Sequence, residues 1–322
     1  MGTFQVKMVK KAIIISLSGH KLTKVELNIF KKYLPWGVIL FRRNIRDFTQ
    51  LKKLILSIKQ ITRDKNYPIL IDEEGGEVSR LENIINNRNF SQKYFGEIFN
   101  FNQRIGSNIY KYYINEICII LKSLGVSINT IPVLDRQYKF THKFLKNRVY
   151  SSKIKTIKKL SNICIDTCKS NKISTVIKHI PGHGLAKFDS HKKLPVIKKD
   201  LKYLIKNDFK CFKKTRSLFA MTAHILYKKI DNKHCATHSP IIIKKIIRKK
   251  IGFKGIIISD DISMKSLKHN ITKNALEALN AGCNLALYCQ GKSTESLKLL
   301  KNIPPIDEFT RKKTSEFYKF LR

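Results

Sequence analysis

Short apolar runs recur along the chain, and stretches with helical periodicity separate them. Most of the runs are continuously apolar rather than alternating, which is typical of parallel strands covered on both faces. Eight runs are expected to be strands: residues 12–17, 36–41, 69–71, 126–133, 174–177, 218–222, 255–258 and 284–288.

The stretches between the runs predict amphipathic helices at residues 47–61, 105–124, 153–170 and 273–280. Ser239-Pro240 is typical of a helix start, with serine as N-cap and proline in the first turn. Eight strands alternating with helices predict an α/β chain, a single (β/α)8 TIM-type barrel that spans residues 1–322. A doubly wound open sheet is the alternative, but no GxGxxG motif follows the first run.

A barrel of this kind carries its active site at the C-terminal ends of its strands. Polar residues do follow the apolar runs in this sequence. They are Asp72, Glu73 and Glu74 after the third run, Asp135 after the fourth, Lys178 and His179 after the fifth, His224 after the sixth, and Asp260 and Asp261 after the seventh.

Residues 178–191, KHIPGHGLAKFDSH, form the segment richest in candidate chemistry. On a helix, His179 and His183 would share one face as a metal pair, but Pro181 and Gly182 between them argue against a continuous helix. We therefore expect a strand end followed by a loop, and no metal. A metal site built from His179, His183 and Asp189 is a minor alternative.

The formal net charge is +41, which would ordinarily suggest a nucleic-acid partner. Here lysine far exceeds arginine and is spread along the whole chain with isoleucine and asparagine. This pattern indicates the coding bias of an AT-rich genome, whereas specific nucleic-acid readers favour arginine forks and clustered basic stripes. We expect no specific nucleic-acid partner, only weak binding at low salt.

The location expected from the sequence is the cytoplasm. Seven cysteines without a CxxC pair suit a reducing compartment. The apolar run at residues 12–17 is too short for a signal-peptide core, and no window reaches the length of a membrane span. A protein that is monomeric and has no membrane partner is therefore expected.

Several segments resemble one known family, the bacterial β-N-acetylhexosaminidases of glycoside hydrolase family 3. They are IDEEGGEVSR, KHIPGHGLAKFDSHKKLP, MTAHILY, GFKGIIISDDISM and ALNAGCNLALYC, in the family's order. The resemblance runs from about residue 36 to residue 289. It implies a cytoplasmic enzyme of muropeptide recycling, which removes terminal N-acetylglucosamine from its β-1,4 link to anhydro-N-acetylmuramic acid. The sequence departs from the family pattern at Glu73, Glu77, Leu185 and Ala186, which leaves fine substrate contacts open.

The resemblance also implies roles for individual residues. Retaining glycosidases place a nucleophile and a proton donor on opposite faces of the sugar. Asp260 is the expected nucleophile, and His191 the expected acid/base, oriented by Asp189. The expected sugar-binding residues are Asp72, Arg80, Arg148, Lys178 and His179. No cofactor is implied.

Other residues of the motifs are expected to support the site. Glu74 and Asp261 are expected to be structural, and His183 to shape its loop. His224 is left open between the pocket and the core.

Two other functions stay open at this point. A phosphorylase on the same scaffold would resolve the glycosyl-enzyme with phosphate, because a neutral histidine repels an anion less than a carboxylate does. A catalytically silent basic binding protein would account for the net charge. The intact Asp260, Asp189 and His191 argue against lost catalysis.

Overall fold

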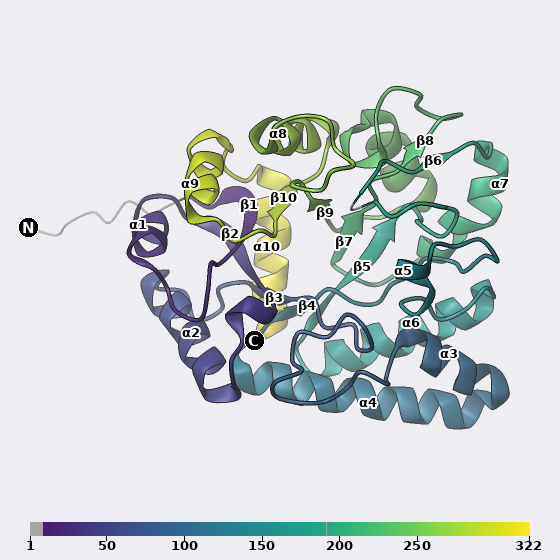
Figure 1. The fold of residues 1–322 in the computed structure, drawn as a ribbon, viewed down its shortest axis with the longest axis horizontal. Coiled ribbons are helices and arrows are strands. Elements are labelled where there is room, and N and C mark those ends of the chain that lie inside the picture. Colours follow the sequence, from purple (N-terminus) through teal and green to yellow (C-terminus); the bar gives the residue numbers. More distant parts are fainter. Residues whose placement is uncertain (1–8, 191) are drawn as a thin grey trace, which may run out of the picture.

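The computed structural model describes residues 9–190 and 192–322, and its centre is a closed barrel of eight parallel strands. Figure 1 shows the strands surrounded by helices, so the predicted (β/α)8 architecture is confirmed. In barrel order the strands are β1 (Lys11–Ser16), β10 (Leu285–Tyr288), β9 (Ile256–Asp261), β7 (Phe219–Thr222), β5 (Ser174–Ile180), β4 (Ile128–Asn129), β3 (Ile69–Ile71) and β2 (Pro35–Leu40).

Each of the eight predicted runs corresponds to one barrel strand, and the limits differ by more than one residue in the fourth, fifth and seventh runs; the seventh is longer than predicted because β9 continues to Asp261. The fourth run is mostly loop, because β4 keeps only two residues. The fifth run is longer than predicted, since β5 continues to Ile180 and so includes Lys178 and His179. All residues of β2, β3, β5, β7 and β10 are buried, as expected for strands covered on both faces.

Helices cover the outside of the barrel with their apolar faces inward. In α2, for example, Leu51, Leu54, Ile55 and Ile58 are buried, and each such side chain contributes roughly 1.5–3 kcal/mol. The helices are α1 (Lys24–Lys32), α2 (Phe48–Ile61), α3 (Gln92–Phe101), α4 (Gln103–Leu124), α5 (Lys143–Lys146), α6 (Ile154–Ser170), α7 (Leu201–Lys206), α8 (Ile271–Ala281), α9 (Ser293–Asn302) and α10 (Glu308–Leu321).

A further helix with π-type hydrogen bonding covers Ile241–Ile251. It begins where the Ser239-Pro240 pair predicted a helix start. The Oγ atom of Ser239 accepts a hydrogen bond from the backbone N–H of Ile242 at 3.1 Å, as an N-cap does.

Helix α10 closes the N-terminal end of the barrel, and in Figure 1 it lies in yellow behind the strands. The indole N–H of Trp36, at the start of β2, donates to Oγ1 of Thr314 at 2.8 Å. The ring of Phe317 lies 6.2 Å from that of Trp36 and 5.5 Å from that of Phe219, the first residue of β7. This end of the barrel is therefore an aromatic floor.

A second, two-stranded sheet lies outside the barrel. It pairs β6 (Val196–Ile197) with β8 (Leu226–Tyr227) and follows the loop that leaves β5. Within residues 9–190 and 192–322, no helix is both long and apolar enough to cross a membrane.

Candidate active site

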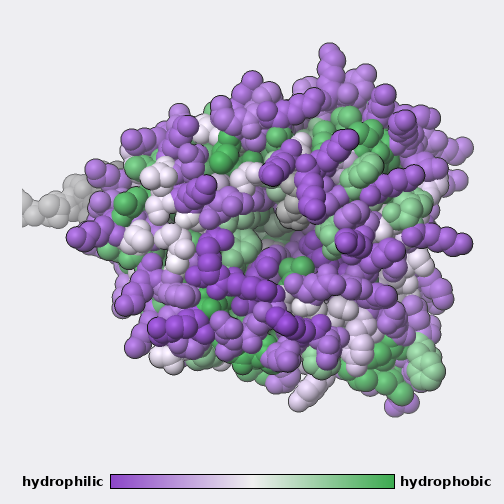
Figure 2. Space-filling model, viewed as in Figure 1, coloured by the Kyte–Doolittle hydropathy of each residue, from purple (hydrophilic) through white to green (hydrophobic). Residues whose placement is uncertain are grey.

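A cavity of about 230 Å³ lies at the C-terminal ends of the barrel strands. Figure 2 shows a mostly hydrophilic face that is hollowed near its centre, over the barrel. Six of the eight predicted site residues line the cavity: Asp72, Arg80, Arg148, Lys178, His179 and Asp260.

The strands explain how residues distant in sequence come together. Asp72 follows β3, Lys178 and His179 belong to the last part of β5, and Asp260 lies in β9. Because the C-terminal ends of parallel strands meet at one end of a barrel, these side chains converge on a single cavity.

Ion pairs join the charged residues of the cavity into one network. The Nζ atom of Lys178 lies 2.5 Å from Oδ1 of Asp72 and 2.6 Å from Oε1 of Glu74. Arg80 donates to Oδ2 of Asp72 at 2.6 Å. Arg148 donates to both carboxylate oxygens of Glu74, at 2.8 and 2.7 Å. Three cations therefore hold two carboxylates, in the paired arrangement that buried charges require.

The network keeps Asp72 ionised. Burial alone would raise the pKa of Asp72, but the charges of Lys178 and Arg80 outweigh burial and hold this pKa well below its usual range. The hydroxyl of Thr130 also donates to Oδ1 of Asp72, at 2.6 Å. A charged acceptor of this kind binds a hydroxyl group more strongly than a neutral one does.

Glu74 supports the site through ion pairs without lining the cavity. Its side chain is 1% exposed, and it is absent from the described lining of the cavity although it pairs with both Lys178 and Arg148. Burial opposes ionisation of Glu74, but Arg148 and Lys178 outweigh it and lower the pKa of Glu74. These contacts agree with the structural role expected of Glu74, and they show which two residues it positions.

Asp135 contacts both His179 and His183. Its Oδ2 atom lies 2.7 Å from Nδ1 of His179, and its Oδ1 atom accepts from the backbone N–H of His183 at 2.6 Å. A carboxylate at Nδ1 favours a proton on that nitrogen and fixes the orientation of the His179 ring. Sequence reasoning noted Asp135 only as a polar residue after a run; its partners were not foreseen.

His183 lines the cavity, and its contacts fit the loop-shaping role expected of it. Its Nε2 atom lies 3.0 Å from the hydroxyl of Ser190, farther along the same loop. Burial lowers the pKa of His183 to about 4. This imidazole is therefore neutral at pH 7 and holds the loop by hydrogen bonds rather than by charge.

Asp260 and Asp261 occupy different environments at the end of β9. Asp260 lines the cavity, and its Oδ1 atom accepts from the backbone N–H of Asp261 at 2.8 Å. Asp261 also reaches the cavity lining, but its carboxylate accepts from the backbone N–H and the hydroxyl of Ser263 and from the backbone N–H of Cys289. Burial raises the pKa of Asp261. Asp261 thus caps a turn, as expected, while Asp260 faces the cavity.

His224 is a buried core histidine, which settles the alternative left open by the sequence. Its Nδ1 atom lies 2.7 Å from Oγ1 of Thr237, and its Nε2 atom lies 3.0 Å from the backbone oxygen of Asp261. Both ring nitrogens are thereby satisfied inside the protein.

The predicted acid/base pair lies in the loop between β5 and β6. Asp189 is partly exposed, and its backbone oxygen accepts from the N–H groups of Lys192 and Lys193. Among the described residues of this loop, Ser190 lines the cavity and Asp189 does not. His191 lies outside the described residues.

The remaining lining was missed by sequence reasoning, and most of it is apolar. Phe144, on α5, packs edge-on against His183 with ring centroids 5.4 Å apart, and Arg80 lies over the ring of Phe41. Nothing in the sequence distinguishes Phe144 from a core residue. The other missed residues are Ile39, Val78, Ser190, Met221, Leu287 and Cys289.

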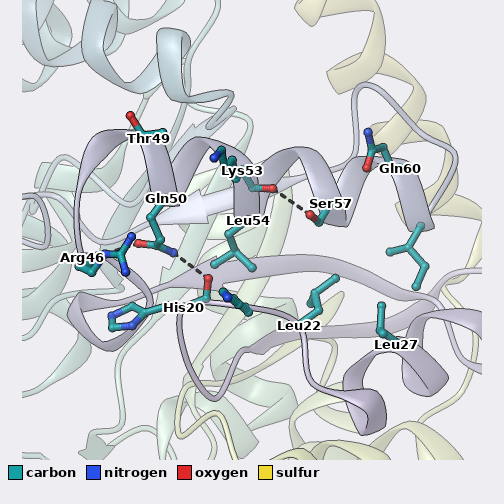
Figure 3. Close-up of a pocket in the computed structure, with 12 residues that line it drawn as sticks. His20, Leu22, Leu27, Arg46, Thr49, Gln50, Lys53, Leu54, Ser57 and Gln60 are labelled. Atoms are coloured by element: carbon teal, nitrogen blue, oxygen red, sulfur yellow. Dashed lines mark hydrogen bonds between the residues drawn. The ribbon is translucent and has the colours of Figure 1, made fainter.

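A larger cleft, of about 840 Å³, lies between α1 and α2 and is drawn in Figure 3. Its described lining contains leucines, Arg46 and Lys53 but no carboxylate. Gln50 donates to the backbone oxygen of His20 within the cleft at 2.8 Å. A glycosidase of the retaining type requires a carboxylate nucleophile, so the smaller cavity at the strand ends is the candidate active site. Nor do the described side chains of His, Cys, Asp and Glu converge anywhere in groups of three or more that could hold a metal ion.

Comparison with known proteins agrees with this geometry. Residues 3–310 match the model of the glycosyl hydrolase family 3 N-terminal domain. A β-hexosaminidase of Methylobacillus flagellatus is 32% identical over 296 residues, which cover 90% of this chain and 84% of the relative. A β-hexosaminidase of Haemophilus influenzae is 29% identical over 304 residues, covering 91% and 85%.

A solved structure has the same fold. It is NagZ from Neisseria gonorrhoeae in complex with N-trifluoroacetyl-D-glucosamine, with a TM-score of 0.87 and 25% identity. The match covers 96% of this chain and 90% of that one. The chain therefore belongs to glycosyl hydrolase family 3, as its motifs predicted, and is a glycoside hydrolase.

Proposed function

We propose that this hydrolase is a retaining exo-β-N-acetylglucosaminidase that acts on muropeptides. It would cleave the β-1,4 link between terminal N-acetylglucosamine and anhydro-N-acetylmuramic acid, as a cytoplasmic, single-domain monomer. The observation that carries the proposal is one small cavity that joins Asp260 to the ion-pair network of Asp72 and Lys178. A volume of about 230 Å³ suits a single terminal sugar rather than the inside of a chain.

The charged lining supplies the contacts that a sugar needs. Asp72 would accept hydrogen bonds from sugar hydroxyls, and Arg80, Arg148 and Lys178 would donate to sugar oxygens. His179, fixed by Asp135 at 2.7 Å, would present a ring nitrogen of defined protonation. Ion pairs hold these groups before the substrate arrives, so little reorganisation is needed on binding.

Asp260 would act as nucleophile. Its carboxylate would attack the anomeric carbon while the bond to the aglycone oxygen breaks and His191 gives that oxygen a proton. Water would then attack the same carbon, returning a proton to His191 and releasing Asp260. Asp189 would orient the imidazole of His191 and stabilise its charged form.

The relatives support the choice of sugar. Two curated relatives are named β-hexosaminidases, and NagZ of Neisseria gonorrhoeae was crystallised with an N-acylated glucosamine.

The test is product analysis with p-nitrophenyl N-acetyl-β-glucosaminide and with a natural muropeptide, in the presence and absence of phosphate. The wild type is expected to release N-acetylglucosamine from both, and Asp260→Asn is expected to lose on the order of 10⁴-fold or more in kcat. Asp166→Asn, an exposed carboxylate on α6, is the matched control and is expected to keep full activity.

Each other outcome has a definite meaning. A glycosyl phosphate as main product would make the enzyme a phosphorylase. No turnover by the wild type would favour the alternative of a catalytically silent basic binding protein. Full activity of Asp260→Asn would rule out Asp260 as the nucleophile.

A further inference from the structure

A groove of about 560 Å³ lies on the outer side of the loop that leaves β5. Three large apolar side chains are exposed there: Phe140 at 46%, Phe188 at 55% and Val196 at 47%. Exposed apolar side chains gathered in one hollow are typical of a binding surface. In Figure 1 the neighbouring elements α5, β6 and β8 lie on the right-hand side of the barrel.

Four exposed lysines surround these apolar side chains: Lys187, Lys193, Lys198 and Lys199. Lys187 lies over the ring of Phe140 at 5.5 Å, and Lys193 over that of Phe188 at 5.7 Å. None of the four forms an ion pair with any residue that the structure describes. The groove therefore combines apolar faces with cations that have no anionic partner among the described residues.

The groove and the active-site cavity have no lining residue in common, but residues close together in the same two segments line them. Phe144 and Ser190 line the cavity, whereas Phe140 and Phe188 line the groove. These four residues belong to two segments, 138–146 and 183–190.

Hydrogen bonds tie these two segments together. Oγ1 of Thr141 donates to the backbone oxygen of Gly184 at 2.8 Å, and the N–H of His142 donates to that of Ala186 at 3.4 Å. The two segments that line the groove and the cavity are therefore held together as one unit.

The proposed reaction mechanism explains why a binding surface would lie beside this loop. A general acid must come within hydrogen-bond reach of the leaving oxygen, so the loop that carries it lies beside the aglycone. In the sequence, Phe188 and Lys193 stand on either side of Asp189 and His191. An aglycone that leaves the cavity past this loop would therefore lie near residues that line the groove.

We propose that the groove binds the part of the substrate beyond the scissile bond, and that this part carries carboxylates. The proposal rests on the proposed function, since it assigns the leaving group of the same reaction. The lysines would pair with the carboxylates, and the phenylalanine rings would pack against the apolar faces of the sugar or peptide.

A chain with 64 lysines and arginines has basic clefts elsewhere, and the cleft between α1 and α2 is one of them. Figure 3 shows Arg46 and Lys53 there, with leucines as the apolar lining. No phenylalanine, tyrosine or tryptophan and no residue of the loop after β5 is among its described lining. This cleft provides matched control variants that remove the same charge from another basic surface.

The experiment compares Lys193→Gln/Lys198→Gln with the control Lys21→Gln/Lys53→Gln. One substrate is N-acetylglucosamine linked to a peptide-bearing anhydromuramic acid, which carries carboxylates. The other is the neutral p-nitrophenyl glycoside. The value of kcat/KM for the peptide-bearing substrate is divided by that for the neutral glycoside. In the groove variant this ratio is expected to fall about 3- to 10-fold, mainly because KM for the peptide-bearing substrate rises, and in the control it should stay at the wild-type value.

Binding of the free peptide-bearing anhydromuramic acid, measured by calorimetry, tests the groove without turnover. The groove variant is expected to weaken it by the same factor. An unchanged ratio and unchanged binding, or equal losses in the control, would overturn the proposal. A wild type that binds this aglycone through the groove but cleaves neither substrate would instead contradict the proposed function alone.

Discussion

The two ends of the barrel are built from the same strands but solve different problems. At the C-terminal end, Lys178, Asp72 and Glu74 bury charges against one another around a cavity. At the N-terminal end, Trp36 and Phe317 pack a dry aromatic floor. Barrel enzymes keep chemistry at the first end and stability at the second. Substitutions at the two ends should therefore change different measured quantities.

The largest effect on stability is expected at the floor. Phe317→Ala removes a fully buried ring that contacts Trp36 and Phe219, and it should lower the free energy of unfolding by about 3–5 kcal/mol. Denaturant unfolding gives the stability, and kcat measured well below the melting temperature should stay at the wild-type value.

The matched control for the floor is Phe309→Ala on the same helix, where the ring is 41% exposed. It should change the free energy of unfolding by less than about 1 kcal/mol. If Phe317→Ala lowered kcat of the folded enzyme, the two ends would be coupled and the division proposed here would fail.

A smaller effect on stability, joined to a loss of activity, is expected for Glu74→Gln. The substitution leaves Lys178 and Arg148 without a full counter-charge, which should cost roughly 3 kcal/mol. Displaced cations should also lower kcat/KM by about 10²-fold. Steady-state kinetics and denaturant unfolding on one preparation measure both; a loss of stability with unchanged kcat/KM would show that Glu74 positions nothing.

The pH dependence gives this variant a signature of its own. Arg148 and Lys178 outweigh burial and lower the pKa of Glu74 in the folded state. Stability from this group is therefore present above its unfolded pKa, about 4.3, and is lost as the pH falls through the folded value. The stability advantage of the wild type over Glu74→Gln should shrink below about pH 4.

The smallest effect on stability is expected at the neighbouring residue, Glu73. Its carboxylate accepts from the backbone N–H groups of Arg80 and Leu81 and from Nδ2 of Asn87. Burial raises the pKa of Glu73, so folding favours its protonated form and the contribution to stability falls as the pH rises. Glu73→Gln removes that penalty and should be within about 1 kcal/mol of the wild type at pH 7.

A buried acceptor nearby makes the substitution feasible. Oδ1 of Asn87 accepts no hydrogen bond from any described residue, so the amide of Asn87 can turn over to meet the new glutamine. Thermal unfolding between pH 4 and 8 measures the difference. A loss above 3 kcal/mol at pH 7 would mean that the charge of Glu73 is needed.

The barrel could be predicted because continuous apolar runs report burial on both faces, a local property of the sequence. Helix α10 was not predicted, because Trp36 and Phe317 meet only in three dimensions. The site divides in the same way. Motifs pointed to Asp72, Lys178 and Asp260, whereas the pairing of Asp135 with His179 and the lining by Phe144 depend on contacts between distant segments.

The closed order of the strands also bears on how the protein is made. Strand β1 pairs with β10, and it also bonds the segment before α10, because the backbone N–H of Ala12 in β1 donates to the backbone oxygen of Pro304. Strand β1 is synthesised before residues 285–321, so the edge that pairs with β10 stays uncovered until those residues are made. During translation β1 exposes an unpaired edge, and the ring of strands can close only after β10 has left the ribosome.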